Sequence, residues 1–388
     1  MVNILFITYY DFSSNSTIQI HNFANALVKI GNDCCVAVPT NKKSLEEYIG
    51  GEIRYTPLNY SDLDRPHLFT NGKGPDIIHA WTPREIVRKQ CLVSLKKFNC
   101  KLIIHLEDNE ESLLENALKT PIEMLKAYPS EKLNALIPDF LSHPYFYEDF
   151  INLADGITVI MDKLITFVPQ GKKYLILWPG VDRSRFTPGG DNTNLKKELG
   201  ISHNDLVLCY TGNVHFANAK EVRSLYLAVA LLNREGIPTK LIRTGIDFND
   251  FLGDNTEWAY KYSIEMGFLP HQKISELLNI SDILVQPGKP DKFNEYRLPS
   301  KLPEFFIMGK PVILPNVNVG RFIRDHQEGL LLEKGNALDI VSKIKLIVAD
   351  PGLYRRLSTG GHLFALRMFD LDINTKKLDT FYKDIQNS

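Results

Sequence analysis

Cysteine is scarce in this sequence, and its cysteines are not spaced as metal ligands or as a redox pair. Their number is odd, and no two are separated by the two residues typical of zinc sites and thiol–disulfide catalysts. These features argue against a disulfide framework and favour a reducing compartment. The five cysteines are Cys34, Cys35, Cys91, Cys100 and Cys209.

The sequence also lacks a long apolar run and a secretion signal. No run approaches the roughly 20 apolar residues of a membrane-spanning helix. The first residues, MVNILFITYYDFSSNS, have no basic segment and no small-residue cleavage site, and they are typical of a first β-strand. We therefore expect a cytoplasmic protein.

An excess of charge of one sign is missing as well. Lys and Arg together number 45 and Asp and Glu 46, which gives a formal net charge of -1. A dedicated nucleic-acid-binding protein normally has a basic excess, so we expect no nucleic-acid partner. A small basic group, Lys96, Lys97 and Lys101, leaves open a peripheral contact with anionic lipid; a solvated surface is the alternative.

Short apolar runs alternate with amphipathic helical patterns along the whole chain. Continuous apolar strands separated by helices predict parallel sheets covered on both faces, and 388 residues suffice for two such domains. The strands are predicted at 3–8, 34–39, 76–81, 101–106 and 156–161, and then at 206–211, 240–245, 263–269, 282–287 and 311–315. Helices are predicted at 17–30, 271–280, 300–308 and 374–385, and a further helix has its apolar face at 222–232.

We therefore expect an α/β protein of two doubly wound, Rossmann-like domains that face each other across a cleft. The Pro- and Gly-rich stretch 178–190 predicts the boundary. The domains are expected at 1–180 and 181–365, with a final helical segment, 366–388, that packs back on the first. Open parallel sheets bind ligands beyond the carboxyl ends of their strands, so the loops there are where function is sought.

A set of segments with a characteristic order covers most of the chain. The segments are PDIIHAW (75–81), ADGITVI (154–160), ILWPGVDRSRFTP (176–188), TGNVHFANAKEV (211–222), GFLPHQKISELLNISDILVQPG (267–288) and PSKLPEFFIMGKPVILP (299–315). No single segment is decisive, but taken in this order they resemble the retaining GT-B glycosyltransferases of family 4. The resemblance implies a hexosyltransferase that binds a nucleotide-sugar donor in its C-terminal domain and an acceptor in its N-terminal domain.

A carboxylate is the natural partner of the two ribose hydroxyls of such a donor, and Glu304 is the candidate. Its position matches the second glutamate of the family's E-x7-E motif; a surface helix glutamate is the alternative. The position of the first glutamate holds Tyr296, so we assign Glu295, one residue away, as a catalytic candidate. The alternative is that Arg297 and Asn294 do a different job.

The diphosphate of the donor needs helix N-termini and cations, because negative charge develops on it as the glycosidic bond breaks. One helix start follows Gly212 and Asn213, and the other is predicted at Ser300 and Lys301. The family's usual Arg is absent around Asn213, so other side chains are expected to replace it; Asn218 can instead cap a helix. The expected donor-binding residues are Gly212, Asn213, His215, Asn218, Lys220, Arg297, Ser300 and Lys301, with Lys301 also catalytic and the base near Phe268 and Leu269.

His105 ends a predicted strand of the N-terminal domain, where the resemblance implies a histidine that contacts the transferred sugar. A structural histidine with a backbone hydrogen bond is the alternative. The polar residues that follow it, Glu107, Asp108 and Asn109, are expected to bind acceptor hydroxyls; a helix cap is the alternative.

The resemblance implies transfer with retention at the anomeric carbon, in which the departing phosphate assists the acceptor. We expect no cofactor and no metal ion, because neither of the Asp-x-Asp strings at 62–64 and 370–372 follows a strand in the right place, and we expect both in solvated loops. The acceptor is a glycan, a lipid-linked glycan or a small molecule. Two alternatives stay open: a nucleotide-sugar epimerase or hydrolase on the same fold, and a non-catalytic binding module.

Overall fold

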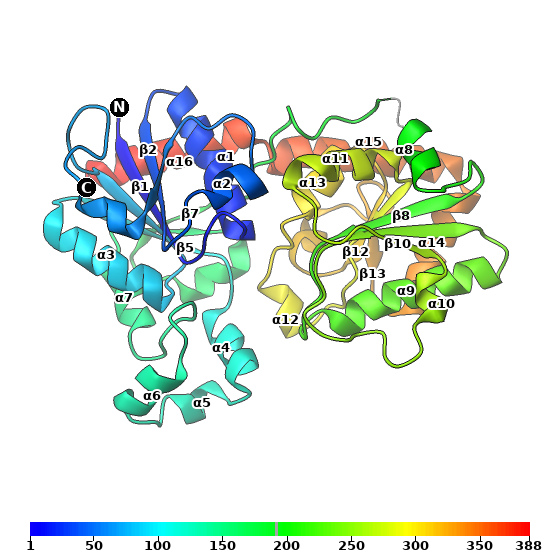
Figure 1. The fold of residues 1–388 in the computed structure, drawn as a ribbon, viewed down its shortest axis with the longest axis horizontal. Helices are drawn as coiled ribbons and strands as arrows, with labels where there is room; N and C mark the ends of the chain where they lie inside the picture. Colours follow the sequence, from blue (N-terminus) through cyan, green and yellow to red (C-terminus); the bar gives the residue numbers. More distant parts are fainter. Residues whose placement is uncertain (191–192) are drawn as a thin grey trace. The chain divides into compact units, whose positions relative to one another are not determined.

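The computed structural model describes residues 1–190 and 193–388, and it divides the chain into two compact units. The first unit combines Met1–Gly180 with Leu371–Ser388, and the second is Val181–Asp370. Each unit is built on one parallel sheet with helices on both of its faces (Figure 1). The predicted fold class, two doubly wound Rossmann-like units, is therefore confirmed.

The sheet of the first unit has the strand order β3-β2-β1-β4-β5-β6-β7, and all its pairs are parallel. The chain moves outward from β1 to β3 and then returns to the other side of β1 at β4. The loops that follow β1 and β4 therefore lie at a topological switch point, where open sheets bind ligands. The strands are β1 (Asn3–Thr8), β2 (Asp33–Val38), β3 (Thr56–Asn59), β4 (Ile77–Trp81), β5 (Lys101–Leu106), β6 (Gly156–Val159) and β7 (Lys173–Ile176).

Helices α1 and α16 pack together on this sheet, and α3 and α7 also pack together. Ser14 begins α1 by accepting a hydrogen bond from the Thr17 amide, and Gly31 follows its end with φ +95°. Helices α4, α5 and α6 enclose a small apolar cluster of their own around Leu125 and Leu133. The helices are α1 (Asn15–Lys29), α2 (Ser44–Tyr48), α3 (Glu85–Lys97), α4 (Glu110–Leu118), α5 (Ile122–Leu125), α6 (Ser130–Leu136), α7 (Tyr147–Leu153) and α16 (Leu371–Gln386), with 3₁₀ turns at Tyr60–Asp64 and Asp162–Phe167.

Helix α16 completes the core of the first unit although it follows the whole second unit in the sequence. Its side chains Leu378, Phe381, Tyr382 and Ile385 are buried together with residues of α1 and β1. The Tyr382 hydroxyl hydrogen-bonds His79 Nδ1 at 2.7 Å. The chain returns to the first unit at Leu371, not at 366, because α15 runs to Met368 and packs on α13 in the second unit.

The sheet of the second unit has the order β10-β9-β8-β11-β12-β13, again with parallel pairs. Its switch point lies between β8 and β11, because the chain moves outward from β8 to β10 and then returns. The strands are β8 (Leu206–Thr211), β9 (Thr239–Thr244), β10 (Ser263–Glu265), β11 (Ile283–Val285), β12 (Val312–Pro315) and β13 (Leu330–Leu332).

Helices α9 and α14 pack against each other on one face of this sheet, and α11, α13 and α15 lie on the other (Figure 1). Several predicted elements are shorter than expected: the strand at 263–269 ends at Glu265, the strand at 282–287 covers only Ile283–Val285, and the helix at 300–308 begins at Leu302. The helices are α8 (Thr193–Glu198), α9 (Ala219–Arg234), α10 (Glu257–Tyr260), α11 (His271–Ile280), α12 (Lys292–Glu295), α13 (Leu302–Ile307), α14 (Ala337–Ala349) and α15 (Pro351–Met368), with a 3₁₀ turn at Asn318–Phe322.

No helix in the described parts of the chain has both the length and the apolar character needed to cross a bilayer. The basic group expected at the surface is partly neutralised. Lys97 lies 3.6 Å from Asp64 and donates to the Leu63 carbonyl, and Lys101 lies 3.2 Å from Asp155.

Candidate active site

The Lys301 ammonium lies beside the Gly212 loop, at the switch point of the second unit. A methyl group added to Gly212 would lie 2.8 Å from Lys301 Nζ, and Gly212 has φ +134°, which only glycine adopts readily. Lys301 Nζ also lies 4.4 Å from the centroid of the Tyr210 ring, at the end of β8. The structure thus brings together Gly212 and Lys301, two predicted donor-binding residues that are far apart in the sequence.

Positive charge gathers around Lys301. Burial lowers the pKa of Lys301 to about 7, the charge of Arg297 lowers it further, and Glu304 opposes the shift. Burial also lowers the pKa of His215 to about 4, and Arg297 and Lys301 add to that shift. No carboxylate of the described residues forms an ion pair with Arg297 or Lys301. The positive charge at this edge of the sheet therefore favours the binding of an anion.

The Gly212 loop is held by side chains that the sequence predicted as donor ligands. Asn218 Oδ1 accepts from the His215 amide at 2.8 Å, and its Nδ2 donates to the Asn213 carbonyl at 3.0 Å. Asn213 Oδ1 accepts from the Ile246 amide at 2.8 Å, in the loop after β9. Asn218 stands at the N-cap position of α9, but its side chain forms no cap hydrogen bond there. Asn213 and Asn218 thus already use these side-chain atoms to shape the loop.

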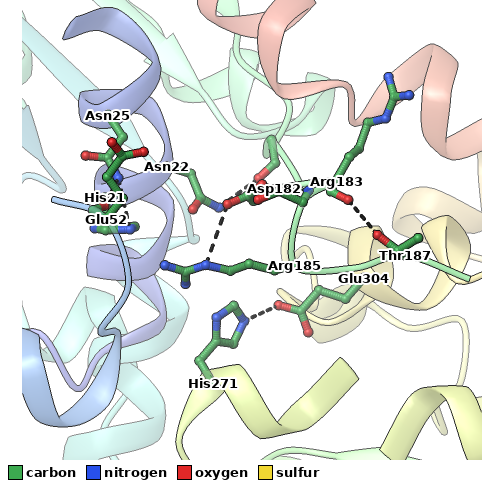
Figure 2. A network of polar contacts seen from close by, with 12 residues as sticks. His21, Asn22, Asn25, Glu52, Asp182, Arg183, Arg185, Thr187, His271 and Glu304 are labelled. Carbon is green, nitrogen blue, oxygen red and sulfur yellow. Dashed lines mark hydrogen bonds and ion pairs between the residues drawn. The ribbon is translucent and has the colours of Figure 1, made fainter. Parts of the chain in front are cut away.

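Glu304 and His271 point toward each other from α13 and α11, as Figure 2 shows. His271 Nε2 donates to Glu304 Oε1 at 2.6 Å, and only 15% of the Glu304 side chain is exposed. His271 Nδ1 is buried without a partner in the described residues. Reasoning from the sequence missed His271, although it lies two residues after Leu269, at the start of a predicted helix.

The other predicted donor residues are less closely organised. Ser300 does not cap α13, whose N-cap position is Lys301 and lacks a side-chain cap bond. Lys220 is exposed on α9, and Phe268 is exposed after β10. Glu295 is the last residue of α12; its neighbour Asn294 is buried and donates to Glu221 Oε1 at 2.6 Å.

His105 is buried inside the first unit. Its side chain is 1% exposed, and its ring centroid is 4.0 Å from that of Trp81. Nδ1 shares a hydrogen bond with Thr158 Oγ1 at 2.8 Å, and Nε2 is buried without a partner in the described residues. Thr158 also binds His79, so His105 belongs to a buried polar chain inside the sheet layer. A catalytic role for His105 stays a prediction.

Glu107, two residues further on, lies at the carboxyl end of β5. Trp81 Nε1 donates to its Oε1 at 2.6 Å, and the Ser16 hydroxyl donates to its Oε2. Burial raises the pKa of Glu107 to about 7; Asp108 adds to the shift, while Ser16, Trp81 and Arg84 oppose it. Glu107 is therefore a carboxyl group that can take up or release a proton near neutral pH.

Arg84 organises the acidic residues around Glu107, and reasoning from the sequence missed it. Arg84 Nη2 lies 3.2 Å from Asp108 Oδ2, and Nε lies 3.4 Å from Glu110 Oε2. Its guanidinium carbon lies 3.9 Å from the centroid of the Tyr9 ring. A signal was present, because residues 9 and 84 follow the two central strands that flank the switch point.

Of the three predicted acceptor residues, Asn109 caps α4 by accepting from the Ser112 amide at 3.1 Å.

The topology of the two units defines the GT-B fold, which the solved structures support. The Anabaena protein HepE, solved in complex with UDP and glucose, aligns with a TM-score of 0.72 and 14% identity over 99% of this chain and 100% of that one. Sucrose-phosphate synthase from Thermosynechococcus elongatus aligns with a TM-score of 0.70 and 15% identity over 99% of each chain. A UDP-N-acetylglucosamine 2-epimerase described as putative, from Listeria monocytogenes, gives a TM-score of 0.60 and 11% identity over 97% of this chain and 95% of that one.

Residues 205–350 match the family model "Glycosyl transferases group 1", so the second unit carries a glycosyltransferase family domain. A D-inositol 3-phosphate glycosyltransferase of Actinosynnema mirum is 26% identical over 54% of this chain and 51% of its own length. That of Geodermatophilus obscurus is 24% identical over 51% of this chain and 44% of its own length. The chain thus spans about half the length of these relatives or less. The resemblance to group 1 glycosyltransferases is confirmed, and its placement in family 4 stays a prediction.

Proposed function

We propose that the protein is a retaining, family 4 type glycosyltransferase that moves a sugar from a nucleotide-sugar donor to a hydroxyl-bearing acceptor. The observation that carries the proposal is Lys301, whose ammonium lies against the Gly212 loop at the switch point of a glycosyltransferase family domain. Gly212 lets the backbone approach a phosphate closely, and Lys301 supplies charge there.

In this proposal the diphosphate of the donor lies against the Gly212 loop, Lys301 and Arg297. Negative charge grows on the diphosphate as the bond to the sugar breaks, and these cations stabilise it in surroundings of low dielectric constant. Glu304 accepts hydrogen bonds from the ribose hydroxyls through the lone pairs that His271 leaves free. The exposed Phe268 ring lies near the base. We also propose UDP as the nucleotide to test first, because HepE was solved with UDP.

We further propose that the cations do the work for which other enzymes use a divalent ion, so that neither metal nor cofactor is needed. In each of the two Asp-x-Asp strings at least one acid pairs with a cation: Asp62 binds Lys42 at 2.7 Å, and Asp370 lies 3.4 Å from Arg183. A cytoplasmic location is proposed from the free thiols of the described cysteines.

The test of the proposed function is a panel of UDP-, GDP- and ADP-sugars, each with a mixture of sugar acceptors. A transferred sugar with retained anomeric configuration, seen by NMR, supports the proposal. Lys301→Met should lower kcat/KM about 100-fold, the usual loss when a group that stabilises transition-state charge is removed. Lys376→Met, on the exposed face of α16, is the control and should match the wild type. No turnover with any donor, or wild-type turnover in Lys301→Met, contradicts the assignment.

The ribose contact has its own measurement. UDP should bind the wild type more tightly than 3′-deoxy-UDP, and Glu304→Ala should weaken UDP binding and erase that difference, because the partner of the hydroxyl is gone. His271→Ala should reduce the difference in affinity between UDP and 3′-deoxy-UDP without abolishing it. Calorimetry that shows unchanged UDP affinity in Glu304→Ala would remove Glu304 from this role.

One observation keeps a second function open. A carboxyl group that titrates near neutral pH, such as Glu107, is what a nucleotide-sugar epimerase or hydrolase needs as an acid–base catalyst. The same donor panel separates the two functions, because an epimerase yields a new nucleotide sugar and a hydrolase yields free sugar when no acceptor is present.

A further inference from the structure

The polar cluster at the switch point of the first unit is strongly acidic. One cation, Arg84, is surrounded by three carboxyl groups, on Glu107, Asp108 and Glu110. The Trp81 indole and the Ser16 hydroxyl complete the cluster, and both donate to Glu107. The loops after β1, β4 and β5 thus bring together groups that accept hydrogen bonds and leave negative charge in excess.

Most of the Arg84 side chain is already engaged by the cluster. Its residue is 7% exposed, Nη2 pairs with Asp108, Nε pairs with Glu110, and its guanidinium carbon lies against the Tyr9 ring. Burial disfavours its charge, but Glu110 and its other neighbours outweigh burial and raise the pKa of Arg84 above the ordinary value. An anion that approached Arg84 would be repelled by the carboxylates already bound to it.

The other cations near these loops are engaged elsewhere. Lys126 donates to Glu111 and Glu148, and Arg88 forms two hydrogen bonds with Glu85. On the side of β2 and β3, Lys42 is bound to Asp62, as described above. Among the residues that the structure describes, this edge therefore has no excess of positive charge like that around Lys301.

Two further observations indicate that the cluster receives a ligand. Thr82, between β4 and Arg84, has φ +80°, a strained conformation for a β-branched residue and one that concentrates at functional sites. Its hydroxyl and Glu110 Oε1 are both buried without a partner in the described residues. Asp108, by contrast, keeps 32% of its side chain exposed while Arg84 holds it in place.

We infer that this cluster binds an uncharged, hydroxyl-rich acceptor group and excludes phosphorylated or carboxylated ones, with Arg84 as a positioning residue that fixes Asp108 and Glu110. The inference rests on the proposed glycosyl transfer. Carboxylates accept hydrogen bonds from sugar hydroxyls, whereas a second negative charge brought near them is repelled. The acceptor would then differ in charge from the one in the names of the two relatives, D-inositol 3-phosphate.

The test compares acceptors in matched pairs: glucose with glucose 6-phosphate, mannose with mannose 6-phosphate, and myo-inositol with its 3-phosphate. The assay uses the nucleotide sugar that proves active as a donor. In any pair that contains an accepted sugar, kcat/KM for the neutral acceptor should be at least about tenfold higher than for its phosphorylated partner, since like charges in contact are strongly disfavoured. Asp108→Asn should narrow this preference by raising kcat/KM for the phosphorylated member. Glu46→Gln, an exposed acid on α2, is the control and should leave it unchanged.

Arg84→Lys tests the positioning role apart from folding. It keeps the charge but cannot hold two carboxylates at once, so KM for the neutral acceptor should rise while the affinity for UDP stays at the wild-type value. Equal or better use of phosphorylated acceptors, or no use of any neutral one, overturns the inference. A protein that binds and turns over no nucleotide sugar overturns the proposed function instead, so the two failures are distinct.

Discussion

At the scale of single residues, the role proposed for Lys301 couples donor binding to the uptake of a proton. Its lowered pKa of about 7 leaves the free side chain mostly neutral at about pH 8.5, and a bound diphosphate restores the charge. We expect UDP binding at that pH to take up about one proton and its affinity to fall as pH rises further. Calorimetry in two buffers of different ionisation enthalpy measures the uptake.

Lys301→Arg is the matched control for this prediction, because the guanidinium stays charged across the whole range. It should bind UDP without proton uptake. Uptake that is absent in the wild type, or equal in both proteins, would contradict the role given to Lys301.

Glu107 links the acidic cluster to stability. Burial raises its pKa to about 7, above the ordinary value of a glutamate, so the folded state binds more protons than the unfolded state between those two values, and stability falls as pH rises through this window. Glu107→Gln mimics the protonated form. We expect it to match the wild type at about pH 5 and to be more stable by about 1–3 kcal/mol at pH 8, from thermal unfolding. Glu46→Gln should show no such trend, and a constant difference between wild type and Glu107→Gln at both pH values would refute the prediction.

At the scale of elements, two glycines let the loops after β8 and β9 come together. A methyl group on Gly245 would lie 2.7 Å from the Asn213 nitrogen and closer still to the Gly212 carbonyl. Gly245→Ala should therefore push the Gly212 loop away from Lys301 and weaken UDP binding at least about tenfold. Calorimetry measures the affinity, and circular dichroism confirms the fold.

Gly253→Ala is the control that separates the steric clash with the Gly212 loop from the strain of placing alanine at a positive φ. Gly253 has φ +86°, close to the +108° of Gly245, but a methyl group there would meet nothing within 4 Å. It should lose stability through backbone strain and keep its affinity for UDP. Equal losses of affinity in both variants would mean that the close approach of the two loops is unimportant.

The elements also show which parts of the fold the sequence could predict. Every strand predicted from an apolar run is present, and the three that were missed, β3, β7 and β13, are all sheet edges. Residues of β7 are half-buried or exposed, so no apolar run marks it, and β13 is buried but only three residues long. Apolar runs mark strands that are buried on both faces, as the central strands are; β7 has too few buried residues and β13 too few residues in all to be marked in this way.

The candidate site was predictable only where a motif marks it. Gly212, Lys301 and Glu304 were found because their segments resemble a family pattern, and Glu107 and Asp108 because they follow a strand. Arg84, Tyr9 and His271 needed the structure, because their roles come from contacts between loops that are distant in sequence. His105 lies near the end of β5 as predicted, but β5 is buried on both faces, so its ring is enclosed as well.

For the whole molecule, the proposal makes the protein independent of divalent ions. Lys301 and Arg297 already supply the positive charge that such an ion would bring. Excess EDTA should therefore leave kcat/KM within about twofold of its value in added Mg²⁺. A loss of turnover in EDTA that Mg²⁺ restores would show that a metal ion takes part.

The return of α16 to the first unit has a consequence for synthesis. The 190 residues of Val181–Asp370 stand between the first unit and the helix that fills its core, and ribosomes add about 5–20 residues each second. Until then the surface that Tyr382 and Phe381 will cover stays open to water and to other nascent chains. The second unit can therefore complete its fold before the first unit does, and we expect chaperones to bind the incomplete first unit during that time.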